Sequence, residues 1–138
     1  MVARTPVSEI MATNIVAISR SEDLNRAEAL FKKHKIRHLP VVIGESIVGM
    51  LSYADLLKIS NADTTNDEHD IETVIYDLFT IEQVMTKDVV CIDSNTNIKD
   101  ATEIITKSNF HALPVVDDSI LVGIVTSTDL LNYYLKQF

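Results

Sequence analysis

The chain repeats itself at a fixed offset of 74 residues without a gap. When residues 7–58 are placed on residues 81–132, 14 of the 52 positions are identical, whereas average residue usage would give roughly 3 or 4 by chance. The best-matched blocks are Leu39-Pro40-Val41-Val42 on Leu113-Pro114-Val115-Val116, and Asp55-Leu56-Leu57 on Asp129-Leu130-Leu131. The chain therefore consists of two copies of one folding unit.

Both copies show the same order of hydrophobic patterns. A short helical turn, whose second copy opens with a Thr80-x-x-Gln83 capping box, precedes a β-branched run at 15–18 or 89–92. An amphipathic helix capped by Ser21 or Asn95 follows, and then a β-hairpin and a closing helix that begins after Ser52 or Thr126. The sequence predicts an α/β fold of two β-α-β-β-α repeats packed with pseudo-two-fold symmetry.

The predicted boundaries are 1–59 for the first repeat, 60–79 for an acidic, partly helical connector, and 80–138 for the second repeat. The start of the connector, 60–66, has loop composition. A helical period then predicts a helix from about Asp67, whose apolar stripe packs onto the repeats or marks a partner surface; its members are Ile71, Val74, Ile75, Leu78 and Phe79.

Composition excludes several functions. The 138 residues suffice for one domain with a real core, and the formal net charge of −8 disfavours nucleic acids and anionic membranes as partners. We find no apolar run long enough to span a membrane and no signal peptide, and we expect a cytoplasmic protein. Cys91, the one cysteine, lies in an apolar run and is predicted to be a buried structural thiol.

Bond-making chemistry has little support. The four histidines show no metal-ligand spacing, and nucleophile-elbow, phosphate-loop and dinucleotide motifs are missing from the sequence. We therefore expect neither an enzyme, nor a metal site, nor a resident cofactor. A small enzyme is the weakest of the three functional hypotheses.

A polar motif, Gly-x-x-Ser/Thr-x-x-Asp, recurs where each hairpin ends, as Gly49-Met50-Leu51-Ser52-Tyr53-Ala54-Asp55 and Gly123-Ile124-Val125-Thr126-Ser127-Thr128-Asp129. Ser or Thr followed three residues later by an acid is an ordinary helix-capping box. The same groups suit a ligand, because a helix N-terminus and a hydroxyl can bind phosphate and a carboxylate can accept from both hydroxyls of a ribose. Both interpretations stay open.

A second polar position precedes each Leu-Pro pair, as Arg37-His38 in one copy and His111 in the other. Arg37 belongs to the basic run 32–38, within a segment, 1–58, that holds 8 basic and 6 acidic residues, a net charge of +2. The connector region, 59–85, has 7 acidic residues and none that is basic, which gives −7. We interpret Lys32, Lys33 and Lys35 as a solvated helix end, and Arg37 as a candidate phosphate ligand.

These motifs together resemble a tandem pair of CBS domains, named after cystathionine β-synthase and also called a Bateman module, over about residues 6–135. The resemblance implies that adenosine-containing ligands bind in the cleft between the repeats, in two symmetry-related sites built from both copies. It also implies that such modules pair through their helices into homodimers.

Carried over by position, the resemblance implies one site in which Asp129 binds the ribose. The phosphate contacts in this site are Thr126, Ser127, Thr128 and His111. The apolar residues around the adenine are Ile15, Val16 and Ile36. The other site uses Asp55, Ser52 and Arg37, with Val89, Val90 and Phe110 around the base. The Asp55 site departs from the pattern, because Ala54 replaces the Thr128 hydroxyl and Tyr53 stands where the other copy has Ser127.

The leading hypothesis is thus a stand-alone regulatory module that senses AMP, ADP, ATP or a related adenosyl compound and signals to an effector protein. The alternative is a dimerising interaction module whose cleft is vestigial. The apolar tail from Leu130 to Leu135 supports self-association.

Overall fold

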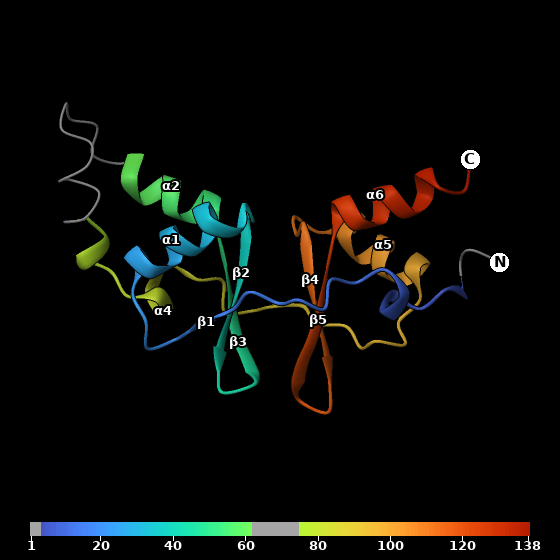
Figure 1. Ribbon diagram of the computed structural model, residues 1–138, viewed down its shortest axis with the longest axis horizontal. Helices are drawn as coiled ribbons and strands as arrows, with labels where there is room; N and C mark the ends of the chain where they lie inside the picture. Colours follow the sequence, from blue (N-terminus) through green and yellow to red (C-terminus); the bar gives the residue numbers. More distant parts are fainter. Residues whose placement is uncertain (1–3, 62–74) are drawn as a thin grey trace. The chain divides into compact units, whose positions relative to one another are not determined.

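The computed structural model describes residues 4–61 and 75–138, which belong to two compact units (Figure 1). The first-repeat unit is Val16–Asp88, and the second-repeat unit joins Met1–Ile15 to Val89–Phe138. Each unit combines a small sheet with helices. The predicted fold class, an α/β chain of two repeats, is confirmed.

The first-repeat unit holds a three-stranded sheet in the order β1-β2-β3. Helix α1 packs against β2, while α2 follows β3 directly and packs against both β3 and α1. The elements are β1 (Ile18–Ser19), α1 (Leu24–His34), β2 (His38–Ile43), β3 (Ser46–Ser52), α2 (Tyr53–Asn61) and α4 (Ile81–Val84).

The second-repeat unit has the same arrangement, with α5 and α6 in the places of α1 and α2 (Figure 1). Its elements are the 3-10 helix η2 (Val7–Glu9), α5 (Ile98–Lys107), β4 (Ala112–Asp117), β5 (Ile120–Thr126) and α6 (Ser127–Leu135). The hairpin β4-β5 repeats the register of β2-β3 at the offset of 74, including a shift after Val115 that matches the one after Val41.

The predicted first strand of each repeat is shorter than expected. Only Ile18 and Ser19 of the first run form a strand, where Ile18 pairs in parallel with Val41. In the second copy the run 89–92 contributes a single parallel bridge from Ile92 to Val115. The β-branched residues before these pairs lie outside the ladder, so composition overestimated the strand length.

The short turn that begins each repeat packs in the unit of the other repeat. Thr86 bridges Met50 of β3, with N···O distances of 2.8 and 3.0 Å, and Ala12 bridges Ile124 of β5 in the same way at 2.9 and 3.0 Å. Val7, fully buried, joins the core of the second-repeat unit. Ile81 and Met85 correspondingly join the core of the first-repeat unit.

These exchanged turns pack on two glycines. A Cβ atom added at Gly49 would overlap the Met85 side chain, and one added at Gly123 would overlap the Met11 side chain. At Gly123 the added atom would also lie 3.2 Å from the backbone oxygen of Ala12. At Gly123 glycine leaves space for a backbone segment that crosses the strand, whereas at Gly49 the added atom meets only the Met85 side chain.

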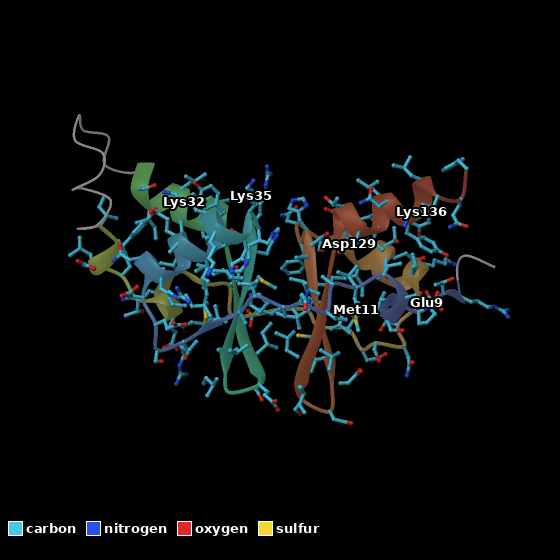
Figure 2. All side chains as sticks on the ribbon, in the orientation of Figure 1. Glu9, Met11, Lys32, Lys35, Asp129 and Lys136 are labelled. Carbon is cyan, nitrogen blue, oxygen red and sulfur yellow. The ribbon has the colours of Figure 1, made fainter. Side chains whose placement is uncertain are left out.

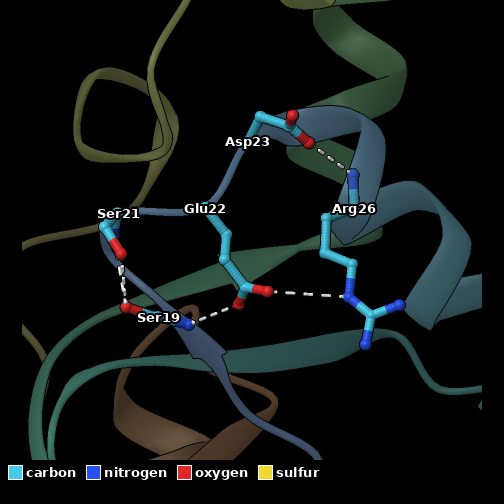
Figure 3. A network of polar contacts seen from close by, with 5 residues as sticks. All are labelled: Ser19, Ser21, Glu22, Asp23 and Arg26. Atoms are coloured by element: carbon cyan, nitrogen blue, oxygen red, sulfur yellow. Dashed lines mark hydrogen bonds and ion pairs between the residues drawn. The ribbon is translucent and has the colours of Figure 1, made fainter.

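The N-caps of α1 and α5 lie two residues beyond the predicted ones. Asp23 Oδ1 accepts from the Arg26 amide at 2.8 Å, whereas the Ser21 hydroxyl pairs with that of Ser19 (Figure 3). In α5 the cap is Asn97, whose Oδ1 accepts from the Asp100 amide at 2.8 Å. Asp and Asn at these positions are as strong caps as Ser, so propensity alone could not place the helix start.

The connector packs differently from the predicted stripe, whose members Ile71 and Val74 lie outside the described residues, as does the predicted helix start. Ile75 is buried as expected, but Leu78 is 70% and Phe79 41% exposed. Tyr76 is buried instead, 3% exposed, and its hydroxyl donates to Glu28 Oε2 at 2.7 Å. Tyr76 can be buried because its hydroxyl has a hydrogen-bond acceptor on α1, and the spacing of apolar residues in the sequence does not indicate such a bond.

We predict that Gly123→Ala lowers the free energy of unfolding by about 1–3 kcal/mol, because the new methyl group has no space between Met11 and the Ala12 carbonyl. Urea unfolding measures the change. Adding Met11→Ala should restore part of the loss.

The matched control is Gly44→Asn. Gly44 has a φ of 61° and nothing within 4 Å of an added Cβ, and Asn tolerates this left-handed conformation. A Gly123→Ala protein as stable as the Gly44→Asn protein would contradict the packing account.

Candidate functional site

Each predicted site begins at the junction where a strand ends and a helix starts, and both junctions form reciprocal capping boxes. At the start of α6 the Thr126 amide donates to Asp129 Oδ2 at 2.9 Å, and the Asp129 amide donates to Thr126 Oγ1 at 3.1 Å. At the start of α2 the Ser52 amide donates to Asp55 Oδ2 at 3.1 Å, and the return bond is also 3.1 Å. The capping interpretation is therefore correct at both junctions.

The residue before each hairpin forms a backbone hydrogen bond with the first residue of the helix at the same junction. The Tyr53 amide donates to the Arg37 carbonyl at 2.8 Å, and the Ser127 amide donates to the His111 carbonyl at 2.9 Å. The Arg37 and His111 side chains are exposed beside these bonds. The structure thus brings the two polar positions that precede Leu-Pro next to the two helix starts.

The capping bonds leave several groups for a ligand. In each capping box the Asp carboxylate accepts through Oδ2, and the two oxygens of a carboxylate together offer about four acceptor sites. The Thr128 side chain is exposed, and within the described residues its amide has no acceptor (Figure 2 shows Asp129, one residue further along). Capping and ligand binding are therefore compatible in one motif.

Fewer backbone N–H groups in the first turn of α6 are available to a ligand than the sequence implied. Ser127 and Asp129 use their amides within the unit, which leaves the amide of Thr128 between them. The same holds in α2, where Tyr53 and Asp55 use theirs.

The two junctions differ in what surrounds them. Ser127 is half-buried at the α6 start, while Tyr53 at the α2 start packs its ring edge-on against Phe31, with centroids 5.5 Å apart. Ala54 is exposed and brings no hydroxyl where Thr128 brings one. The α2 junction thus has fewer donors and a bulkier neighbour.

The apolar residues predicted to surround a base are all accessible to some degree. Val90 is 39% exposed, and the others are half-buried: Ile15, Val16, Ile36, Val89 and Phe110. The first predicted site takes Ile15 from the second-repeat unit and Val16 and Ile36 from the first-repeat unit. The second takes its polar residues from the first-repeat unit and its apolar ones from the second-repeat unit.

Cys91 is exposed, which corrects the prediction of a buried thiol. Its run forms only the one bridge at Ile92, so the apolar neighbours do not enclose it. Partial burial nevertheless raises the pKa of the Cys91 thiol, which disfavours the reactive thiolate.

Residues 4–61 and 75–138 hold neither a cluster of metal-ligating side chains nor a membrane-spanning helix. No three His, Cys, Asp or Glu side chains there gather as metal ligands. No helix in these ranges has both the length and the apolar composition to cross a membrane.

A family model for the CBS domain matches the chain twice, over residues 7–62 and 81–136. These matches cover more than half of the 138 residues, and the chain belongs to the CBS domain family. The CBS domain-containing protein YhcV of Bacillus subtilis is 29% identical over 124 residues, which are 90% of this chain and 81% of that protein.

Solved CBS pairs have the same fold. CBSX2, known from Arabidopsis thaliana and solved in complex with AMP, is 25% identical with a TM-score of 0.80, and the match covers 96% of this chain and 98% of that one. The CBS pair of MJ0100, solved with 5-methylthioadenosine and S-adenosyl-L-methionine, is 26% identical with a TM-score of 0.80 and covers 97% and 98%.

The chain spans less than half the length of several other curated relatives. They include homoserine O-acetyltransferases and inosine-5'-monophosphate dehydrogenases, of which it spans 22–24%. The activities of those longer proteins are not carried over to this chain.

Sequence reasoning missed a pocket beside the α2 junction, lined by Phe31, Lys32, Lys35, Ile36 and Tyr53. The lysines were interpreted as a solvated helix end, and Phe31 as core. The available signal was the contrast between repeats, because Lys32 and Lys35 correspond to Thr106 and Asn109 in the second copy.

We predict that Thr126→Ala lowers the free energy of unfolding by about 1 kcal/mol, because the Asp129 amide loses its acceptor. Thr128→Ala, two residues further along at an exposed side chain, should change the free energy of unfolding by less than about 0.5 kcal/mol. Urea unfolding of both variants separates the capping role from the surface role; equal losses would contradict it.

Proposed function

We propose that this CBS pair is a regulatory module that binds adenosine-containing ligands such as AMP, ADP, ATP or S-adenosylmethionine in the cleft between its repeats. Ligand occupancy is passed to an effector protein. The observation that carries the proposal is the pair of capped junctions, each with a carboxylate whose Oδ1 is not used by the cap. The adenosyl ligands of CBSX2 and MJ0100 support the ligand class.

At the first proposed site Asp129 accepts from the ribose hydroxyls. A charged acceptor makes these bonds stronger than neutral ones. The phosphate is bound by Thr126, Ser127, Thr128 and the His111 side chain, and the base lies against Ile15, Val16 and Ile36.

At the second proposed site Asp55, Ser52 and Arg37 take the polar roles, and Val89, Val90 and Phe110 contact the base. This site binds more weakly, because Ala54 supplies no hydroxyl and Tyr53 fills space beside Phe31. Arg37 partly compensates, since its guanidinium stays charged at every physiological pH. His111 at the first site binds phosphate best when protonated.

We predict that Asp129→Asn weakens AMP binding by about tenfold or more, because it removes a charged acceptor while Asn can still accept from the Thr126 amide and keep the cap. Asp55→Asn should weaken total binding less. Isothermal titration calorimetry with AMP, ADP, ATP and S-adenosylmethionine measures both.

The matched control is Asp100→Asn. Asp100 occupies the same third position of helix α5, behind the cap Asn97, but belongs to neither proposed site. It should leave ligand affinity unchanged. No binding of any of the four ligands at about millimolar concentration would refute the function, and a larger loss for Asp55→Asn would reverse the ranking of the sites.

A second candidate function, a homodimeric interaction module in the cytoplasm that needs no ligand, is favoured by the outer face of α6. Leu131 and Leu135 are 64% and 68% exposed, while Leu130 faces the core at 3%. Apolar side chains at this spacing form one stripe along the helix. A second copy of the chain would cover it.

We predict that Leu131→Lys with Leu135→Lys converts a dimer to a monomer without altering the fold, because both side chains are exposed. Sedimentation velocity with and without AMP measures the mass. A dimer that forms without ligand, in a protein that shows no ligand-induced thermal shift, favours this second function. An unchanged mass in the double variant would exclude the α6 stripe as the interface.

A further inference from the structure

The pocket beside the end of α1 lies entirely within the first-repeat unit. Its volume is about 190 Å³, and Phe31, Ile36 and Tyr53 form its apolar walls. Phe31 is 3% exposed and makes a T-shaped ring contact with Tyr53, so these walls are defined by packing. Lys32 and Lys35 complete the lining, and Figure 2 labels both at the same end of this unit.

The two lysines are not equivalent. Lys32 Nζ donates to Glu28 Oε1 at 3.2 Å, and Glu28 Oε2 accepts from the buried Tyr76 hydroxyl at 2.7 Å. Glu28 therefore offsets part of the charge of Lys32. Lys35 has no ion-pair partner among the described residues, and its backbone ends α1 in the left-handed conformation with a φ of 53°.

Apolar aromatic walls and lysines together select a particular ligand chemistry. Aromatic side chains pack against planar rings in offset-stacked or edge-to-face contacts, and lysine ammonium groups bind phosphate as compact point charges. The pocket is smaller than the roughly 300–1,000 Å³ of pockets for drug-sized ligands, so a single ring with one anionic substituent fits better than a whole nucleotide.

We propose that this pocket binds a planar ring that carries a phosphate group, with Lys35 as the principal anion contact and Lys32 as a second contact restrained by Glu28. The site requires neither Asp55 nor Asp129, so it does not depend on the ribose contacts of the proposed function. It would add a second ligand class to the module, on the repeat that carries the basic cluster.

The test is an NMR titration of the full chain with phenyl phosphate, which has the ring and the phosphate but no ribose. We expect saturable shifts at Phe31 and Tyr53, to which the proposed adenosyl sites assign no ligand contact. Ile36 lines the pocket as well, but it is also a base contact of the first proposed site and does not distinguish the two. Lys35→Asn should weaken binding by about threefold or more. Asn suits the left-handed backbone and is the residue of the second copy at Asn109, so the cap is kept.

The matched control is Lys33→Gln, which removes the same charge from the same helix end at a residue that does not line the pocket. Its affinity for phenyl phosphate should stay within about twofold of the wild type, the change expected from a screened exposed charge. An equal loss in both variants would show general attraction to a basic surface and overturn the site.

Glu28→Gln provides a second test, in which phenyl phosphate binding is expected to become tighter instead of weaker. The amide oxygen can still accept from Tyr76, but the negative charge 3.2 Å from Lys32 Nζ is removed, so phenyl phosphate should bind about two- to threefold more tightly. Benzyl alcohol, a neutral ring, should bind Glu28→Gln and the wild type equally. Weaker phosphate binding in Glu28→Gln would contradict the role of Lys32.

The outcomes separate this site from the proposed function. Absence of saturable shifts at about 10 mM phenyl phosphate overturns the pocket, whatever AMP does. Shifts with inorganic phosphate as large as those with phenyl phosphate overturn the role of the ring. Phenyl phosphate binding in a protein that fails to bind AMP, ADP, ATP or S-adenosylmethionine leaves the pocket standing and refutes the adenosyl function.

Discussion

The rest of the structure depends on the exchange of the two short turns that begin the repeats. The hairpins β2-β3 and β4-β5 each leave the far edge of their second strand unpaired by the hairpin itself, and an unpaired edge invites aggregation. Thr86 covers that edge at Met50, and Ala12 covers it at Ile124. Because each cover comes from the start of the other repeat, neither copy completes its own sheet, and glycine at 49 and 123 lets the methionine side chains lie against the strands.

The strands that these turns cover lead directly into the junctions that the proposed function uses. The covered strands β3 and β5 run directly into α2 and α6, so the edge that Thr86 and Ala12 hold is continuous with the capping boxes. The boxes satisfy the helix termini with Oδ2 and one hydroxyl oxygen, which costs the site little because Oδ1 is not part of the cap. The capping interpretation of the motif is confirmed, and ligand binding by the same four residues stays a proposal that the cap does not obstruct.

Much of this could be predicted from the sequence, because the 74-residue offset preserves register as well as identity. The hairpins and the helix starts after Ser52 and Thr126 were predictable in both copies, and the observed pairing of Ile18 with Val41 recurs at the same offset as the bridge from Ile92 to Val115. The exchange of the turns could not be predicted, since Met11, Met85 and the two glycines match between copies whichever partner each contacts.

The other features that could not be predicted from the sequence depend on the local environment of single side chains. Tyr76 is buried through a hydrogen bond to Glu28, a contact across 48 residues that no periodicity encodes. Cys91 has apolar neighbours but is exposed, because its run supplies one bridge rather than a strand. The pocket at Lys35 depends on the left-handed end of α1 and the ring contact of Phe31 with Tyr53. The assembly of each adenosyl site from both units stays a prediction.

The central claim is that the Asp129 carboxylate both caps α6 and binds a ribose. A crystal structure of the protein grown with AMP tests it most directly. The account predicts density for both ribose hydroxyls at hydrogen-bond distance from Asp129, with the bond from the Thr126 amide to Oδ2 retained. AMP bound with its ribose away from Asp129, while the capping box stays intact, would contradict the claim and leave that carboxylate a helix cap alone.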